Sequence, residues 1–101
     1  MENITSTGKL WQWSDGKEKA SWFFLTIEKE VGEKIKALMS LEPRKGWGSV
    51  RVRARIGYVS RETSIFPDSK TGAYLLPLKK EVRKELNMKE GDVLSVGLEL
   101  L

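Results

Sequence analysis

An arginine-rich segment holds the residues whose type and spacing could do chemistry. Residues 44–61 contain six basic side chains and no acidic one, and Arg51, Arg53 and Arg55 occupy alternate positions. On a β-strand these three side chains project from one face about 7 Å apart, near the phosphate repeat of a nucleic-acid strand. Trp47 and Tyr58 flank them and could stack on bases. The segment predicts a nucleic-acid site made of Arg44, Lys45, Trp47, Arg51, Arg53, Arg55 and Arg61.

A solvated strand face is the alternative interpretation of the arginines. Charged side chains on a strand discourage unwanted pairing of strand edges. Acidic residues on neighbouring strands, such as Glu62 or Glu99, could also pair with the arginines and neutralise them. The sequence leaves both interpretations open.

A pair of lysines forms a second candidate site. Lys79 and Lys80 stand where a second helix is expected to begin, and the helix dipole disfavours cations there. The equivalent position of the first helix is Glu28. Free backbone N–H groups and the lysines, completed by Arg83, predict an anion-binding site. The alternative is two exposed lysines whose charge is offset by Glu81.

Seven aromatic residues fall on the expected strands. Core packing is the expected role for most of them, because aromatic side chains bury large apolar areas. The alternative is a ligand pocket between them, since a small barrel sometimes encloses one small molecule. The seven residues are Trp11, Trp13, Trp22, Phe23, Phe24, Phe66 and Tyr74.

The composition argues against catalysis. The chain has no cysteine and no histidine, which excludes disulfides, thiolate zinc sites and the commonest general base. Thr63 and Ser64 therefore lack a histidine partner. Asp15, Asp68 and Asp92 are expected in turns, where aspartate is common. We expect a non-enzymatic protein with no cofactor and no metal.

Two similar segments divide the chain into halves. Residues 23–31 (FFLTIEKEV) are echoed by residues 74–82 (YLLPLKKEV), a spacing of 82 − 31 = 51 positions. Each segment runs from an apolar strand into a helix rich in lysine and glutamate. Because a repeat constrains the whole fold, we interpret the chain as one domain made of two β-β-α-β halves, about 1–57 and 58–101.

Hydrophobic periodicity locates six strands and two helices. The clearest strand has Val52 and Ala54 alternating with arginines, a period of two. Apolar residues on both faces of 22–27 predict a strand covered on both sides. The Thr26 hydroxyl is expected to cap the first helix. The predicted strands are 4–13, 22–27, 48–57, 58–66, 73–78 and 93–100, and the predicted helices are about 27–38 and 79–87.

These elements predict a mainly β fold with two helices. Closing the six strands into a barrel protects their edges from pairing with other chains. We therefore expect a pseudo-symmetric double-split β-barrel made of two β-β-α-β halves and helix-capped at both ends. The alternative is an open α+β sheet with both helices on one face.

The ordered set of short patterns resembles a known family. Residues 72–100 resemble the strand–Pro–helix–Gly-Asp–strand element of AbrB/MazE-type barrels. The whole chain is similar to the family called domain of unknown function 1905. That resemblance implies the double-split barrel and no established activity, and DNA binding does not transfer with a fold. The matching patterns are Leu10-Trp11, Trp22-Phe23-Phe24, 46–50, 63–67, 76–80, Val82-Arg83 and Gly91-Asp92.

The net charge and the N-terminal residues limit the classes of partner and the cellular compartment that we expect. The formal net charge of +4 permits an anionic partner. We find no basic region followed by an apolar stretch that would indicate a signal peptide. The apolar run at 22–25 is far shorter than the ~20 residues of a membrane helix. We expect a cytoplasmic monomer or weak homodimer whose partner is nucleic acid or another anion, not a membrane or a metal.

Two further functions stay open at this point. One is a small anionic-ligand-binding barrel, with aromatic side chains lining it and Lys79 and Lys80 holding the anion. The other is a protein-interaction module. A salt-sensitive affinity would favour nucleic acid over both, because phosphate contacts release counterions.

Overall fold

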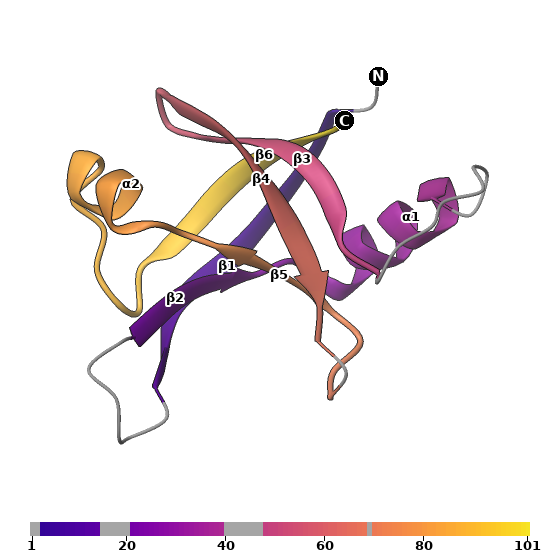
Figure 1. Cartoon of the computed structure of the whole chain (residues 1–101), viewed down its shortest axis with the longest axis horizontal. Helices are drawn as coiled ribbons and strands as arrows, with labels where there is room; N and C mark the ends of the chain where they lie inside the picture. Colours follow the sequence, from indigo (N-terminus) through magenta and orange to yellow (C-terminus); the bar gives the residue numbers. More distant parts are fainter. Residues whose placement is uncertain (1–2, 15–20, 40–47, 69) are drawn as a thin grey trace.

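The chain folds into a closed barrel of six antiparallel strands, with a helix near each end of its long axis (Figure 1). The computed structural model describes residues 3–14, 21–39, 48–68 and 70–101. Each of the six strands pairs with a neighbour on both sides. The predicted closed barrel is therefore confirmed, and the open sheet is excluded.

The strand order around the barrel is β1-β2-β5-β4-β3-β6. All six strands and both helices lie where the sequence periodicity predicts them, within a few residues at each end. Their bounds are β1 Asn3–Ser14, β2 Ser21–Thr26, α1 Lys29–Met39, β3 Val50–Ile56, β4 Val59–Pro67, β5 Tyr74–Pro77, α2 Lys80–Glu85 and β6 Val93–Leu100.

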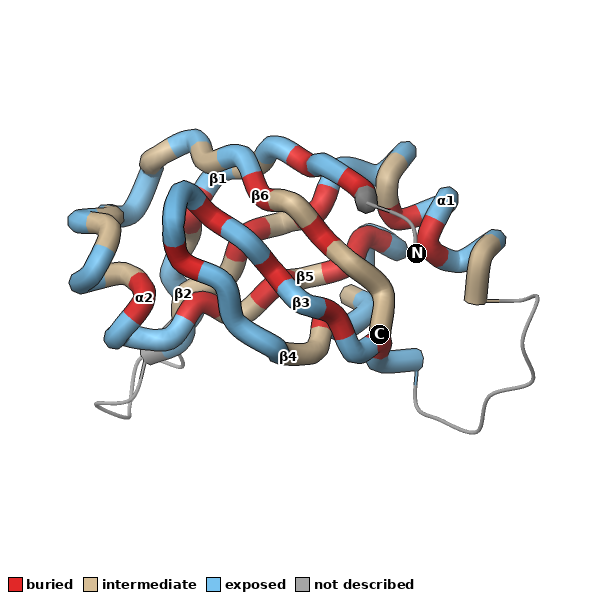
Figure 2. The backbone as a smooth tube through the Cα atoms, turned by 90° about the horizontal axis from the view of Figure 1, so that it is seen from above, coloured by how far each residue is buried: buried red, intermediate tan, exposed pale blue. Residues whose placement is uncertain are grey.

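Aliphatic side chains fill the barrel. Buried and exposed residues alternate along β3, which Figure 2 shows as a change of colour from one residue to the next. Successive side chains of a strand point to opposite faces, so each strand gives every second residue to the interior. The most deeply buried of these interior residues are Leu10, Leu25, Val52, Ile65, Leu76, Val96 and Leu98.

The first helix is attached to the barrel through β1. The backbone N–H of Glu28 donates to the Ser6 hydroxyl at 2.9 Å, and the Glu28 carboxylate accepts from the N–H of Thr7 at 2.8 Å. The sequence predicted that Thr26 caps this helix, and that prediction is wrong. The Thr26 hydroxyl instead accepts a hydrogen bond from Trp11 Nε1 at 2.9 Å. A buried serine 22 residues away in sequence satisfies the helix start instead.

A glycine lies on the buried side of α1. A Cβ atom at Gly32 would lie 3.4 Å from a ring carbon of Tyr74. Gly32 and Ile35 are the buried residues of this helix. Because 3.4 Å is an ordinary van der Waals distance, this position has room for an alanine. No contact among the described residues explains the glycine, which costs about 1 kcal/mol relative to alanine inside a helix.

The second helix is shorter than the sequence predicted. It spans Lys80–Glu85 and contributes Val82 to the buried set. Asn87, which was expected inside the helix, has a φ of 54°. That left-handed conformation ends a helix, and asparagine tolerates it better than most residues do. Among the described residues, no helix has both the length and the apolar character needed to cross a membrane.

Candidate nucleic-acid interface

The three arginines of β3 project from the outer face of the barrel. Arg51, Arg53 and Arg55 are exposed, while the residues between them are buried. The predicted alternation is therefore confirmed. Because β3 lies between β4 and β6, Arg53 stands opposite Glu62 on one side and Glu99 on the other.

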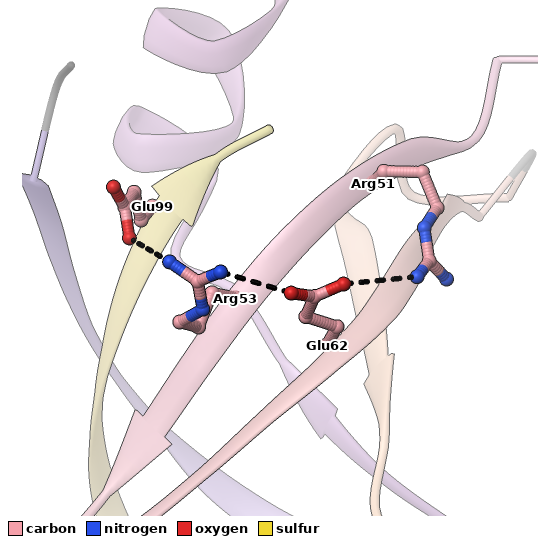
Figure 3. Close-up of polar contacts among 4 residues, drawn as sticks. All are labelled: Arg51, Arg53, Glu62 and Glu99. Carbon is pink, nitrogen blue, oxygen red and sulfur yellow. Dashed lines mark hydrogen bonds and ion pairs between the residues drawn. The ribbon is translucent and has the colours of Figure 1, made fainter.

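Arg53 is held between two carboxylates (Figure 3). Its Nη1 donates to Glu99 Oε1 and its Nη2 donates to Glu62 Oε2, both at 2.9 Å. The hydrogen bond to Glu62 has the largest effect, followed by the one to Glu99, and together they raise the pKa of Arg53 above its ordinary value. Arg51 Nη2 lies 3.9 Å from the second oxygen of Glu62. The alternative interpretation, in which carboxylates on neighbouring strands neutralise the arginines, therefore holds for Arg53. This arginine is poorly placed to meet a phosphate.

Two other predicted arginines have no carboxylate partner among the described residues. Arg55 is exposed on β3. Arg61 Nη1 donates to the carbonyl oxygen of Ser60 at 2.9 Å. Because Arg61 pairs with the buried Ala54, it does not share the outer face of the β3 arginines. Three of the predicted site residues and one predicted turn residue lie outside the described part of the chain: Arg44, Lys45, Trp47 and Asp15.

The predicted anion site at α2 is divided between two free lysines and a fixed arginine. Lys79 and Lys80 are exposed, with no ion-pair partner in the described residues. Arg83 Nε donates to the carbonyl oxygen of Leu78 at 3.2 Å. Its guanidinium carbon lies 3.7 Å from the centre of the Phe23 ring, a cation–π contact. The barrel therefore holds the Arg83 side chain beside the two lysines.

Most of the seven aromatic side chains lie outside the core, so the prediction of core packing is wrong for them. Tyr74 is buried, but Trp13, Trp22 and Phe66 are 46%, 55% and 46% exposed. The reason is the pleat of the strands. Phe23, Leu25 and Ile27 share the interior side of this segment, and Phe23 packs against the core, so Trp22 and Phe24 point outward. Strand 22–27 is covered on one face, not on both.

The outward aromatic residues form one continuous surface on β1, β2 and β4. Across the β1–β2 pair, Trp11 stands opposite Phe24, and Trp13 opposite Trp22. The ring centroids of Trp11 and Phe24 are 5.3 Å apart, and those of Trp22 and Phe24 are 6.5 Å apart. We call this surface the aromatic face; its members are Trp11, Trp13, Trp22, Phe24 and Phe66.

An open groove joins the aromatic face to the cations of α2. Trp22 and Phe66 belong both to the aromatic face and to this groove. Four cationic side chains line it, and Glu81 is the single acidic residue among the described residues that line it. We call it the aromatic–cation groove; the residues that define it are Trp22, Phe66, Arg51, Lys79, Lys80 and Arg83.

The comparison with protein families identifies the chain. The model of a family described as Domain of unknown function (DUF1905) matches residues 7–98. The chain belongs to this family. No curated protein matches the chain. The family description carries no activity, so the function of this DUF1905 domain has to be argued from its surface.

Sequence reasoning on this DUF1905 domain found the charges but missed the groove. It expected core packing for most of the aromatic residues, with a ligand pocket between them as the alternative, and it treated the arginine strand and the α2 lysines as separate sites. No signal in the sequence decided which aromatic residues are exposed, because both faces of 22–27 are apolar. In the structure, Leu25 and Ile27 lie on the interior face. The resemblance to AbrB/MazE-type barrels stays a prediction from the sequence pattern.

Proposed function

We propose that this DUF1905 domain binds single-stranded nucleic acid along the aromatic–cation groove. The observation that carries the proposal is one groove in which two half-exposed aromatic side chains, Trp22 and Phe66, adjoin four cations. Proteins that bind single strands combine these two features, a basic groove that follows the backbone and aromatic rings on which bases stack.

The cations of the groove account for contacts with the phosphates. Lys79 and Lys80 are exposed and have no ion-pair partner among the described residues. Arg51 makes one long contact of 3.9 Å with Glu62 between half-exposed side chains, and pairs of this kind contribute little in water. Three or four phosphate contacts would make the logarithm of the affinity fall with the logarithm of the salt concentration with a slope of about −2 to −3.

The aromatic residues account for a preference for single strands. A base offers its flat face to a protein side chain only when it is not stacked inside a duplex. Trp22 and Phe66 stand on the outer face of the barrel, where an unpaired base reaches them. Arg53, in contrast, is engaged by two carboxylates and adds little to this surface.

The lysines of the groove give the test of the proposal. The double substitution Lys79→Gln and Lys80→Gln should reduce the salt slope of oligonucleotide binding by about 1.4, because each lost phosphate contact on a single strand removes about 0.7. Fluorescence anisotropy with a labelled single-stranded oligonucleotide, titrated at several salt concentrations, measures this slope. The matched control removes two charges at the other end of the barrel, with Lys29→Gln and Lys36→Gln on α1.

An equal loss of slope in the two double variants would contradict a localised site. It would mean that oligonucleotides respond to the net charge of the domain and not to the groove. An unchanged slope in the Lys79 and Lys80 variant would place any phosphate contacts elsewhere on the surface.

A protein partner that docks on the aromatic face is the second candidate function. The observation that favours it is the exposure of Trp13, which belongs to the aromatic face but not to the aromatic–cation groove. Tryptophan and other aromatic side chains dominate the energetics of protein interfaces. Binding through this face would bury apolar area and would depend little on salt, which distinguishes it from binding to phosphates.

We also propose that the barrel is a pseudo-symmetric double-split barrel of two halves, with α1 and α2 capping its ends. The strand order supports the symmetry. Exchanging β1 with β4, β2 with β5 and β3 with β6 leaves the order around the barrel unchanged. Leu25 and Leu76, which are 76 − 25 = 51 positions apart, stand opposite each other in the β2–β5 pair.

Two backbone hydrogen bonds support the same symmetry. Ile27 N–H donates to the Tyr74 carbonyl at 2.8 Å, and Leu78 N–H donates to the Phe23 carbonyl at 2.9 Å. Adding the 51-residue spacing to Ile27 gives Leu78, and adding it to Phe23 gives Tyr74. Each bond is therefore the counterpart of the other, as a two-fold relation between the halves requires.

A further inference from the structure

A small pocket lies between the barrel and α2, beside the aromatic–cation groove. Its floor is apolar and consists of buried side chains that include Ala54, Leu76 and Val82. The pocket has a volume of about 110 Å³. A dry cavity of about 150 Å³ in another protein binds benzene, so this one has room for a short aliphatic chain.

The pocket exists because one interior position of β3 carries a small side chain. Ala54 alternates with arginines on β3, and its interior neighbours Val52 and Ile56 are larger. Ala54 pairs with Arg61 on β4. The missing side-chain volume at Ala54 is therefore next to the base of Arg61, and both residues line the pocket.

The rim of the pocket is cationic. Arg61 and Lys79 line it and have no carboxylate partner among the described residues. Glu62 also lines the pocket, but its carboxylate bonds Arg53 on the outer face (Figure 3). Glu81 is then the remaining acidic side chain of the described lining, so two cations face one carboxylate.

We infer that this pocket binds a short aliphatic carboxylate, with its chain on the apolar floor and its carboxylate at Arg61 and Lys79. Charge and shape agree on this class of ligand. Arginine is the side chain best suited to a carboxylate, because its guanidinium donates two parallel hydrogen bonds. The apolar chain of such a ligand leaves water when it enters a lining that includes Leu76, Leu78 and Val82.

Methyl-detected NMR titration of the full chain with pentanoate tests the inference. We expect saturable shifts confined to methyl groups of the floor, including those of Ala54 and Val82. Pentan-1-ol, which keeps the chain without the charge, should bind about fivefold more weakly, because a partly exposed ion pair contributes about 1 kcal/mol. Acetate, which keeps the charge without the chain, should give no saturable shift of these methyl groups. Equal binding of pentanoate and pentan-1-ol, or no saturable shift with pentanoate, would overturn the inference.

Two substitutions separate the pocket from the oligonucleotide site. Ala54→Leu fills the floor and should weaken pentanoate binding by at least about tenfold, while Arg61→Gln removes the rim cation and should weaken it about fivefold. Neither residue lines the aromatic–cation groove, so both variants should retain the oligonucleotide affinity of the original chain.

A leucine at Ala54 enters a packed interior and can destabilise the fold. Arg61 is exposed, so Arg61→Gln tests the pocket in a variant whose fold is not at risk. Undiminished pentanoate binding in a folded Ala54→Leu variant, or in Arg61→Gln, would refute the assignment. If the unsubstituted chain bound pentanoate but no oligonucleotide, the proposed function would be refuted and the pocket assignment would stand.

Discussion

Replacing Trp22 and Phe66 with alanine should weaken the binding of a single-stranded oligonucleotide more than any charge substitution on this domain. Each stacked base contributes about 1–3 kcal/mol by alanine substitution, so each single variant should lose about 5- to 150-fold in affinity. Both side chains are about half exposed, and their removal costs the fold little. Anisotropy titration at low salt measures the loss, and a thermal melt verifies that both variants stay folded.

Tyr58 provides the matched aromatic control for these substitutions. It is 74% exposed and donates from its hydroxyl to the carbonyl oxygen of Glu85 at 3.3 Å. It follows the arginine strand but does not line the aromatic–cation groove. Tyr58→Ala should therefore bind as the original chain does. If Tyr58→Ala lost affinity while Trp22→Ala did not, the bases would stack beside the arginine strand and not in the groove.

Leu25→Ala should cause the largest loss of stability, about 2–5 kcal/mol in the free energy of unfolding. Leu25 is fully buried and stands opposite Leu76, at the centre of the β2–β5 pair. Its truncation removes buried methyl groups and leaves a cavity between strands that pair on both sides and cannot easily collapse. Urea denaturation followed by circular dichroism measures the change, with the slope of the transition checked for two-state behaviour.

Val93→Ala is the control for the loss of an aliphatic side chain. Val93 lies at the start of β6 and is 67% exposed. Its truncation should change the free energy of unfolding by no more than about 0.5 kcal/mol. A loss below about 1 kcal/mol for Leu25→Ala would show that the β2–β5 pair does not form the packed centre of the barrel.

The alternation of residue types made the strands and the barrel predictable from the sequence. In β3 the arginines cannot be buried without partners, so the apolar residues between them must face the interior. In β6 the same period of two places Val96 and Leu98 on one face, and both are buried. Apolar periodicity therefore determines which face is interior wherever the other face is charged.

The aromatic face could not be predicted in this way, because both faces of β2 are apolar. Trp22 and Phe24 are as hydrophobic as Leu25, and periodicity alone does not say which face a closed barrel encloses. Strand pairing decides it: Phe24 and Thr26 pair with Pro77 and Leu75 on the outer side of the β2–β5 pair. The contacts that make the groove depend on pairings between distant segments, which a single sequence does not display.

The ion pairs of Arg53 could be predicted from the sequence only in part. The sequence named Glu62 and Glu99 as partners on neighbouring strands, and both bond Arg53 at 2.9 Å. Charge complementarity made the pairing plausible, but the register of three strands had to be known before Arg53 could be separated from Arg51 and Arg55. That register removes Arg53 from the set of cations that are free to meet a phosphate.

The binding of matched single-stranded and double-stranded oligonucleotides at two salt concentrations tests the central claim most directly. With about 50 and 200 mM salt, the proposal predicts that the single strand binds more tightly than the duplex and loses about 20- to 50-fold in affinity at the higher concentration. The substitution Trp22→Ala should reduce the binding of the single strand and leave the salt slope unchanged, because stacking releases no counterions. An absence of binding to the single strand at the lower salt concentration, or equal binding of the two forms, would contradict the account.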